Sequence, residues 1–192
     1  GDGSMFLFSG TKYGTQSTVA TTLILQKLTP QGAFVNRVHV YPSVSGVMTT
    51  YRNLCMALLS SGNIFVAYYG GQSAYARYAI YTQNLQLVAP GTISTSGVSP
   101  YHIQPTSNGG ALVFTGDGIH LITAAGVVSL VVSAGGATLC CSDEVNDNSA
   151  VIDNGACAGR IKYAPVPISN GGFGYIYGSA AGTFYVQINA DG

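Results

Sequence analysis

Short apolar runs bounded by small polar residues recur along the chain. In the most regular of them, a polar turn opens into five or six apolar or aromatic residues, and a glycine closes the run. Four decapeptides share this design: Gly1–Gly10 (GDGSMFLFSG), Ser61–Gly70 (SGNIFVAYYG), Ser107–Gly116 (SNGGALVFTG) and Ser169–Gly178 (SNGGFGYIYG). Each decapeptide predicts one β-strand with a turn at either end.

The strand that follows each decapeptide also tends to end alike. Three of the four copies lead to similar turns: LTPQG at Leu28–Gly32, ITAAG at Ile122–Gly126 and INADG at Ile188–Gly192. The second copy departs, with YTQNLQ at Tyr81–Gln86. Agreement at two separate places in the unit indicates internal repeats rather than chance apolar runs.

The repeating unit is long enough for about four short strands, and a period of about 40 to 50 residues is typical of propeller blades. No window of a dozen residues has a 3.6-residue period without Gly or β-branched interruptions, so helix is not expected. The inner runs IFVAYY and ALVF are continuously apolar, which predicts that neighbouring sheets cover both faces. We therefore predict an all-β fold, a β-propeller-like array of four-stranded antiparallel meanders, with a β-sandwich or β-prism as the alternative.

The repeats divide a single domain, 1–192, into units of about 1–46, 51–99, 101–135 and 159–192, with an insertion at 138–160. The first unit lacks a strand before its decapeptide, and the fourth lacks a final strand. Closing a ring would need either blades outside this sequence, including those of a homo-oligomer, or incomplete terminal blades.

The third and fourth units resemble the propeller repeats of secreted and viral proteins. The resemblance is carried by SNGG with ALVF and ITAAG in the third unit, and by SNGG with FGYIY and INADG in the fourth. Similar repeats occur in bacterial adhesins and in phage receptor-binding heads, such as the spike tips of marine membrane-containing bacteriophages. The resemblance implies a propeller architecture and a role in attachment. The motif is mostly turn chemistry, so it does not identify the ligand.

Composition narrows the class of partner. Charged residues make up only 7% of the chain, against roughly 25% in an average soluble domain. The seven Lys and Arg residues balance the seven Asp and Glu residues, so we expect neither nucleic-acid binding nor attraction to an anionic membrane. No apolar run approaches the ~20 residues of a membrane span. A surface built from Ser, Thr, Asn, Gln and Gly is typical of secreted adhesins and viral exterior proteins, which favours an extracellular or virion-surface location.

Acidic residues concentrate in the insertion, where four of the seven fall between Asp143 and Asp153. Ca²⁺ takes six to eight hard oxygen ligands, often from loops. The candidate calcium ligands are Asp143, Glu144, Asn146, Asp147 and Asp153. The alternative is a solvated acidic loop with Asx turns, and a thermal melt with and without chelator would separate the two.

Three of the four cysteines flank this acidic segment. A bridge from Cys141, or from Cys140, to Cys157 would close a loop of about 16 residues and contribute about 3 kcal/mol in the chain-entropy model. Adjacent cysteines on a strand face opposite sides, so the other could meet Cys55. The alternative is four buried thiols. Zinc is not expected, because no Cys-x-x-Cys or His pair accompanies these residues.

No catalytic set is evident. His39, His102 and His120 lie on or beside predicted strands, and none belongs to a nucleophile motif, so we interpret them as structural. Outside the insertion the acids are Asp2, Asp117 and Asp191, each in an Asp-Gly step typical of turns.

Five tyrosines lie near the turn at 70–74, and some of them are candidates for ligand binding. Tyrosine combines flat apolar area with a hydroxyl, which suits sugar recognition and protein interfaces. We select Tyr75, Arg77 and Tyr78 as exposed ligand-binding candidates, with Arg77 able to fork onto a glycan carboxylate. The predicted function is non-catalytic attachment to a cell-surface receptor, with glycan as the expected ligand. The alternatives are a secreted glycan-cleaving propeller enzyme and a structural spacer of a virion or adhesin.

Overall fold

The computed structural model describes residues 3–12, 21–40, 52–70, 75–133, 166–169, 171–179 and 182–192. Within these ranges the fold is all-β, and no helix occurs. The strands are β1 (Met5–Lys12), β2 (Thr21–Leu28), β3 (Phe34–His39), β4 (Arg52–Leu58), β5 (Ile64–Gly70), β6 (Tyr75–Tyr81), β7 (Leu87–Ser94), β8 (Pro100–Pro105), β9 (Ala111–Thr115), β10 (Gly118–Ile122), β11 (Val128–Ser133), β12 (Val166–Pro167), β13 (Phe173–Ser179) and β14 (Gly182–Ile188).

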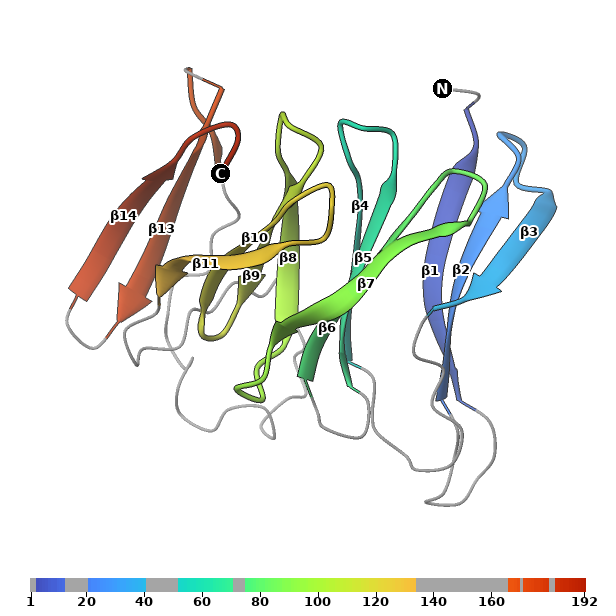
Figure 1. Ribbon diagram of the computed structural model, residues 1–192, viewed down its shortest axis with the longest axis horizontal. Helices are drawn as coiled ribbons and strands as arrows, with labels where there is room; N and C mark the ends of the chain where they lie inside the picture. The colour runs from blue at the N-terminus through green and yellow to red at the C-terminus, as the bar shows by residue number, and fades with distance from the viewer. Residues whose placement is uncertain are drawn as a thin grey trace.

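The strands form four antiparallel sheets that follow one another along the chain. Their orders are β1-β2-β3 in the first sheet, β4-β5-β6-β7 in the second, β8-β9-β10-β11 in the third and β12-β13-β14 in the fourth. Every strand pairs with its neighbour in sequence, so each sheet is a meander. The four sheets stand side by side in chain order (Figure 1).

The four decapeptides occupy equivalent positions. The strands β1, β5, β9 and β13 that they form are called here the motif strands. In the second, third and fourth sheets a leading strand, β4, β8 or β12, precedes and pairs with the motif strand. In the first sheet, β1 is itself the edge strand. The predicted repeat strands thus occur in all four sheets, and no described strand precedes β1.

One turn joins most of these strands. Its first residue donates its N–H to the carbonyl of the fifth, and the fourth donates to the carbonyl of the first. Six complete copies occur in the described ranges: Thr29–Ala33, Leu59–Asn63, Thr82–Gln86, Thr106–Gly110, Thr123–Val127 and Ile168–Gly172. The fourth residue has a positive φ, which glycine adopts without steric cost. We call this the recurrent turn, and all six copies lie at the upper end of the sheets in Figure 1.

The recurrent turn explains why LTPQG and ITAAG are similar, and it also explains the divergent YTQNLQ. Thr29 and Thr123 open two copies, and their hydroxyls accept a hydrogen bond from the backbone N–H of the fifth residue, at 3.1 Å in each. Thr82 opens the divergent YTQNLQ copy with the same bond at 3.2 Å. There Leu85 takes the position of the glycine, with φ 62°. The second unit therefore has the same turn, although its sequence hides it.

The described residues form three apolar cores between neighbouring sheets. Leu23 and Leu25 of the first sheet pack with Ile64, Val66 and Tyr68 of the second. The opposite face of the second sheet packs on the third, and the third packs on the fourth. The residues of these two further cores include Phe65, Ala67, Tyr78, Ile103 and Val113 in one, and Leu112, Phe114, Ile119, Phe173 and Ile188 in the other.

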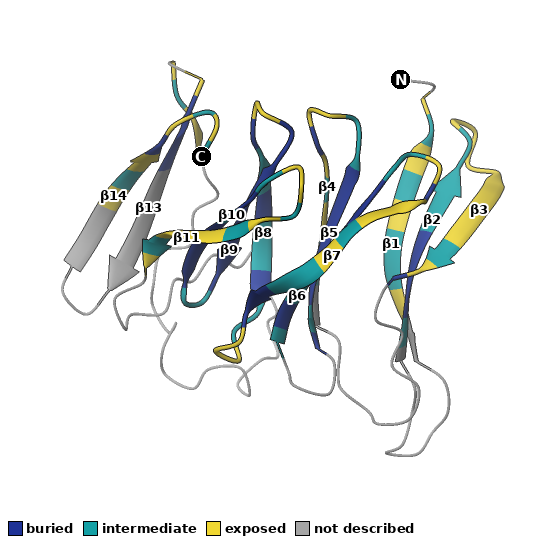
Figure 2. Cartoon of the chain, viewed as in Figure 1, coloured by how far each residue is buried: buried dark blue, intermediate teal, exposed yellow. Residues whose placement is uncertain are grey.

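Both faces of the second and third sheets are thus covered, as the continuous apolar runs predict. Strands β5 and β9 are buried almost throughout (Figure 2). Among the described residues, the first sheet packs against a neighbouring sheet through one face only. Met5 and Leu7, the counterparts of buried Ile64 and Val66, are 43% and 48% exposed. Strand β3 is an edge strand and largely exposed.

Candidate functional site

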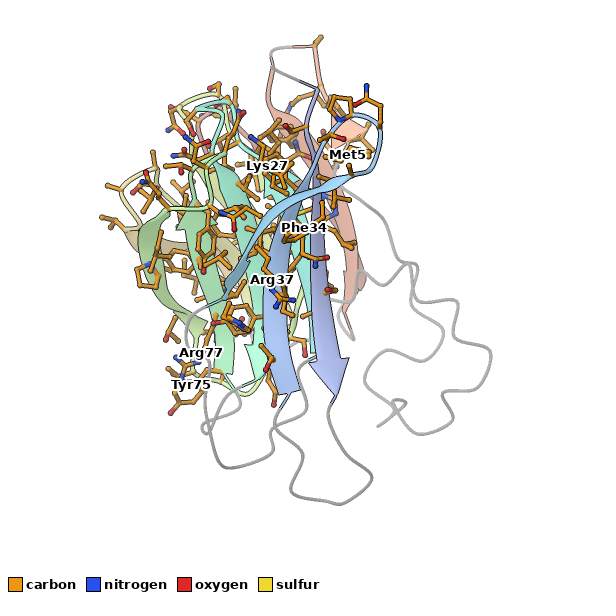
Figure 3. The ribbon with its side chains drawn as sticks, turned by 90° about the vertical axis from the view of Figure 1, so that its right-hand side faces the viewer. Met5, Lys27, Phe34, Arg37, Tyr75 and Arg77 are labelled. Carbon is orange, nitrogen blue, oxygen red and sulfur yellow. The ribbon has the colours of Figure 1, made fainter. Side chains whose placement is uncertain are left out.

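The predicted ligand-binding residues come from β6, where they lie on two different faces. Tyr75 and Arg77 alternate with Ala76 and Tyr78, so they share the face that carries Ala79 and Tyr81 toward the first sheet. The Arg77 guanidinium carbon lies 5.8 Å from the centre of the Tyr75 ring, within cation–π range. Figure 3 shows the two side chains together, at the end of the molecule away from the recurrent turns.

Arg77 is a cation with an unsatisfied hydrogen-bond donor. Its Nε is buried and has no hydrogen-bond partner. A buried donor without a partner costs about 1–3 kcal/mol, and a charged group costs more. Native proteins rarely leave such a group unpaired without a reason, and an acceptor supplied by a ligand is one such reason. Tyr75 and Arg77 are both partly exposed, so a ligand can reach the pair.

Tyr78 was wrongly predicted to be exposed. It is only 2% exposed, because it points to the other face of β6, into the core between the second and third sheets. Its ring stacks on Phe65 with centroids 5.4 Å apart, and its hydroxyl donates to the carbonyl of Gly126 at 2.6 Å. Burial raises the pKa of this hydroxyl. Tyr78 therefore joins two sheets, and only Tyr75 and Arg77 remain as candidates for contact with a ligand.

The structure reveals a polar cluster around Asp117 that sequence reasoning had assigned to a simple turn. The carboxylate oxygens of Asp117 accept hydrogen bonds from Ser94 at 2.5 Å, Ser96 at 2.7 Å and Thr115 at 2.5 Å. His120 Nε2 lies 3.1 Å from the same carboxylate. Ser94 ends β7 in the second sheet, whereas Asp117 lies in the β9–β10 turn of the third. The Ser-x-Ser step and the Asp-Gly step are far apart in sequence, so no local pattern announces the cluster.

The hydrogen bonds around Asp117 suit a structural role. Burial opposes ionisation of Asp117, but the four side-chain hydrogen bonds outweigh that effect and hold its pKa below the ordinary value. A carboxylate so strongly held is a poor proton acceptor near neutral pH. Both serine hydroxyls bond to the carboxylate, and among the described residues neither bonds to His120. A nucleophile and its base are therefore not assembled here.

The other two histidines do not join a catalytic group. His39 lies at the end of β3 and is exposed. His102 packs edge-on against the Phe114 ring, with centroids 5.5 Å apart. Within the described ranges, no three His, Cys, Asp or Glu side chains come together as a metal site would require.

A groove of about 410 Å³ lies between the first and second sheets, near the recurrent turns. It is lined by β1 and the residues before it, by β4 and by neighbouring positions, including Gly3, Ser4, Phe6, Met56, Leu58 and Gln83. None of these side chains is charged. The groove is separate from Tyr75 and Arg77, which lie at the opposite end of the sheets.

The remaining predicted site residues fall outside the described ranges. These are the candidate calcium ligands Asp143, Glu144, Asn146, Asp147 and Asp153 and the candidate bridge between Cys141 and Cys157. Cys55 is described. It lies on β4, packed against the core between the second and third sheets, and burial raises the pKa of its thiol to about 12.

The comparisons with known proteins leave the family open. No family model matches the chain, and no curated protein matches it. A solved structure of a protein of unknown function from Bacteroides caccae is similar at 13% sequence identity and a TM-score of 0.42, over 95% of this chain and 78% of that one. Among the described residues, no helix is long and apolar enough to cross a membrane.

Proposed function

We propose that this chain is a non-catalytic attachment domain that binds an acidic glycan on a cell-surface receptor through Tyr75 and Arg77. The observation that carries the proposal is the buried, unpartnered Nε of Arg77 beside the Tyr75 ring. A planar guanidinium pairs bidentately with a carboxylate or a sulfate, and an adjacent aromatic ring offers a flat face to a sugar. The low charge of the surface and its polar side chains favour an extracellular or virion-surface location.

The propeller arrangement is part of the proposal. Equivalent meanders with neighbours on both faces, and tight turns gathered at one end, are what propeller blades require. In such an architecture recognition falls to the ends of the blades, where Tyr75 and Arg77 lie.

Binding to immobilised glycans tests the proposal. The wild-type chain should bind sialylated or sulfated glycans in preference to their neutral parents, and should release no product from them. Arg77→Ala should weaken binding about 10- to 100-fold, because a hydrogen bond to a charged group contributes about 1.5–3 kcal/mol. Arg77→Lys should recover only part of this, because lysine cannot form the bidentate fork.

The matched control is Arg37→Ala. Arg37 lies on exposed β3, away from Tyr75 and Arg77, and its removal should leave the affinity within about twofold. Equal losses for Arg37→Ala and Arg77→Ala would indicate only general charge attraction. Undiminished binding by Arg77→Ala would reject the site, and product release would favour the glycan-cleaving enzyme.

A further inference from the structure

The groove beside β1 lies where the other sheets have a leading strand. In the second and third sheets, a leading strand pairs antiparallel with the motif strand: β4 with β5, and β8 with β9. In the first sheet, no described strand pairs with the corresponding edge of β1. Exposed strand edges are templates for pairing, and proteins normally protect them with charge, proline or a bulge. The MFLF run of β1 has none of these protections, and its register with β2 is unbroken.

The two faces of β4 support the same reading. Cys55 and Ala57 face the third sheet and are partly covered by its core, where β4 and β8 lie next to each other. Met56 and Leu58 alternate with them, face the groove, and are 39% and 60% exposed. A leading strand on β1 would cover Met56 and Leu58 as β8 covers the other face. The added strand would then contact β4 in the way that β4 contacts β8.

Gly3 has the backbone conformation of a turn that could connect such a strand. Its φ of 73° matches the fourth residue of the recurrent turn, at 82° for Gly62, 85° for Gly109 and 80° for Gly171 before the other motif strands. Strand β1 thus begins as β5, β9 and β13 do. In those three, a recurrent turn joins the motif strand to its leading strand.

We propose that the groove between β1 and β4 is the seat of an extended, uncharged polypeptide strand, which pairs antiparallel with β1 in the place that β4 and β8 take beside β5 and β9. By the register of β4 on β5, residues of this strand opposite Phe6 and Phe8 face the groove. The lining carries no charge, so these residues are apolar or small, as Ala57 and Cys55 are. This β-augmentation site is independent of the glycan site.

The test supplies such a strand. Residues Asn53–Leu59, with Cys55 replaced by Ser, are fused directly before Gly1, which places Gly3 as the fourth residue of a recurrent turn. We expect the melting temperature of the full chain to rise by about 2–4 °C or more. The same extension with proline at the position of Met56 should give no rise, because proline cannot pair within a strand.

A capped peptide of Asn53–Leu58, with the same Cys-to-Ser change, provides the second measurement by fluorescence anisotropy. It should bind saturably to the chain. A Met56→Lys variant of the protein should weaken binding at least tenfold, whereas Leu87→Lys, at an equally exposed apolar position on β7, should not.

Three outcomes would overturn the proposal. The first is no stabilisation by the fused strand together with no binding of the peptide up to millimolar concentration. The second is equal stabilisation by the extension with proline at the position of Met56, which would show that strand pairing is not the cause. The third is a dimer, seen by light scattering, that Met56→Lys dissociates, because a second copy would then occupy the groove.

Discussion

Leu85 has a left-handed backbone where the other copies of the recurrent turn have glycine, with φ 62°. That conformation costs a residue with a Cβ about 1–2 kcal/mol. The Leu85 side chain is 6% exposed and belongs to the core between the first and second sheets. Burial of the side chain and strain of the backbone therefore oppose each other at one residue.

Two substitutions separate these effects. Leu85→Ala keeps the strain and loses the packing, so the free energy of unfolding should fall by about 2–5 kcal/mol. Leu85→Gly loses the packing but relieves the strain, and should be more stable than Leu85→Ala by about 1 kcal/mol. Urea denaturation measures both. In an ordinary strand alanine is the more stable of the two, and that order at position 85 would contradict the strained turn.

Asp117 makes the stability depend on pH. Its pKa is depressed in the folded state, so its contribution is fully present above the unfolded pKa of about 3.9 and is lost as the pH falls toward the folded value. Asp117→Asn should lower the free energy of unfolding at pH 7 by about 1–3 kcal/mol. The gap between wild type and variant should narrow below about pH 4. Denaturation curves from pH 7 to pH 3 check this, and a constant gap would exclude the charge as the cause.

At the scale of strands and sheets, the Tyr78 ring lies across Gly91, its partner on the neighbouring strand β7 of the second sheet. A Cβ added at Gly91 on β7 would lie 2.5 Å from the Tyr78 ring, nearer than real contacts allow. Gly91→Ala should therefore lower the melting temperature, at a cost of about 1–3 kcal/mol for overpacking. Gly97→Ala is the control. A Cβ there meets nothing within 4 Å, so it reports backbone strain alone, from its φ of 76°. Equal effects of the two substitutions would show that the ring does not exclude a side chain at position 91.

The sequence predicts elements better than it predicts what their side chains meet. Strands β5 and β9 were predictable because their apolar runs and flanking glycines are local signals. The turn at Leu85 was not, because a hydrogen-bond pattern that glycine usually marks is formed there without it. Tyr78 was wrongly predicted to be exposed because it lies close to a turn in the sequence. The two-residue alternation of β6, which places it opposite Arg77, decides its burial. The Asp117 cluster needs the β7 end and the β9–β10 turn together, so only the packing of two sheets reveals it.

At the scale of the whole molecule, the covered faces set the order of local stability. The second and third sheets have a neighbour on each face, whereas the first has one covered face, and its Met5 and Leu7 are exposed. Arrays in which each unit contacts only its neighbours gain stability from every interface that they form. Local opening should therefore begin in the terminal sheets, the first and the fourth, whose described residues each form a single interface.

Hydrogen exchange followed by mass spectrometry measures that order. Amides of β5, β6, β9 and β10 should exchange slowest, and those of β1–β3 markedly faster. Phe65→Ala removes a fully buried ring from the core between the second and third sheets, at a cost of about 3–5 kcal/mol. It should reduce protection in both sheets together, because the interface belongs to both. Loss confined to the second sheet would mean that the sheets open independently, and equal protection of the first and second sheets would contradict the stabilising role of the covered faces.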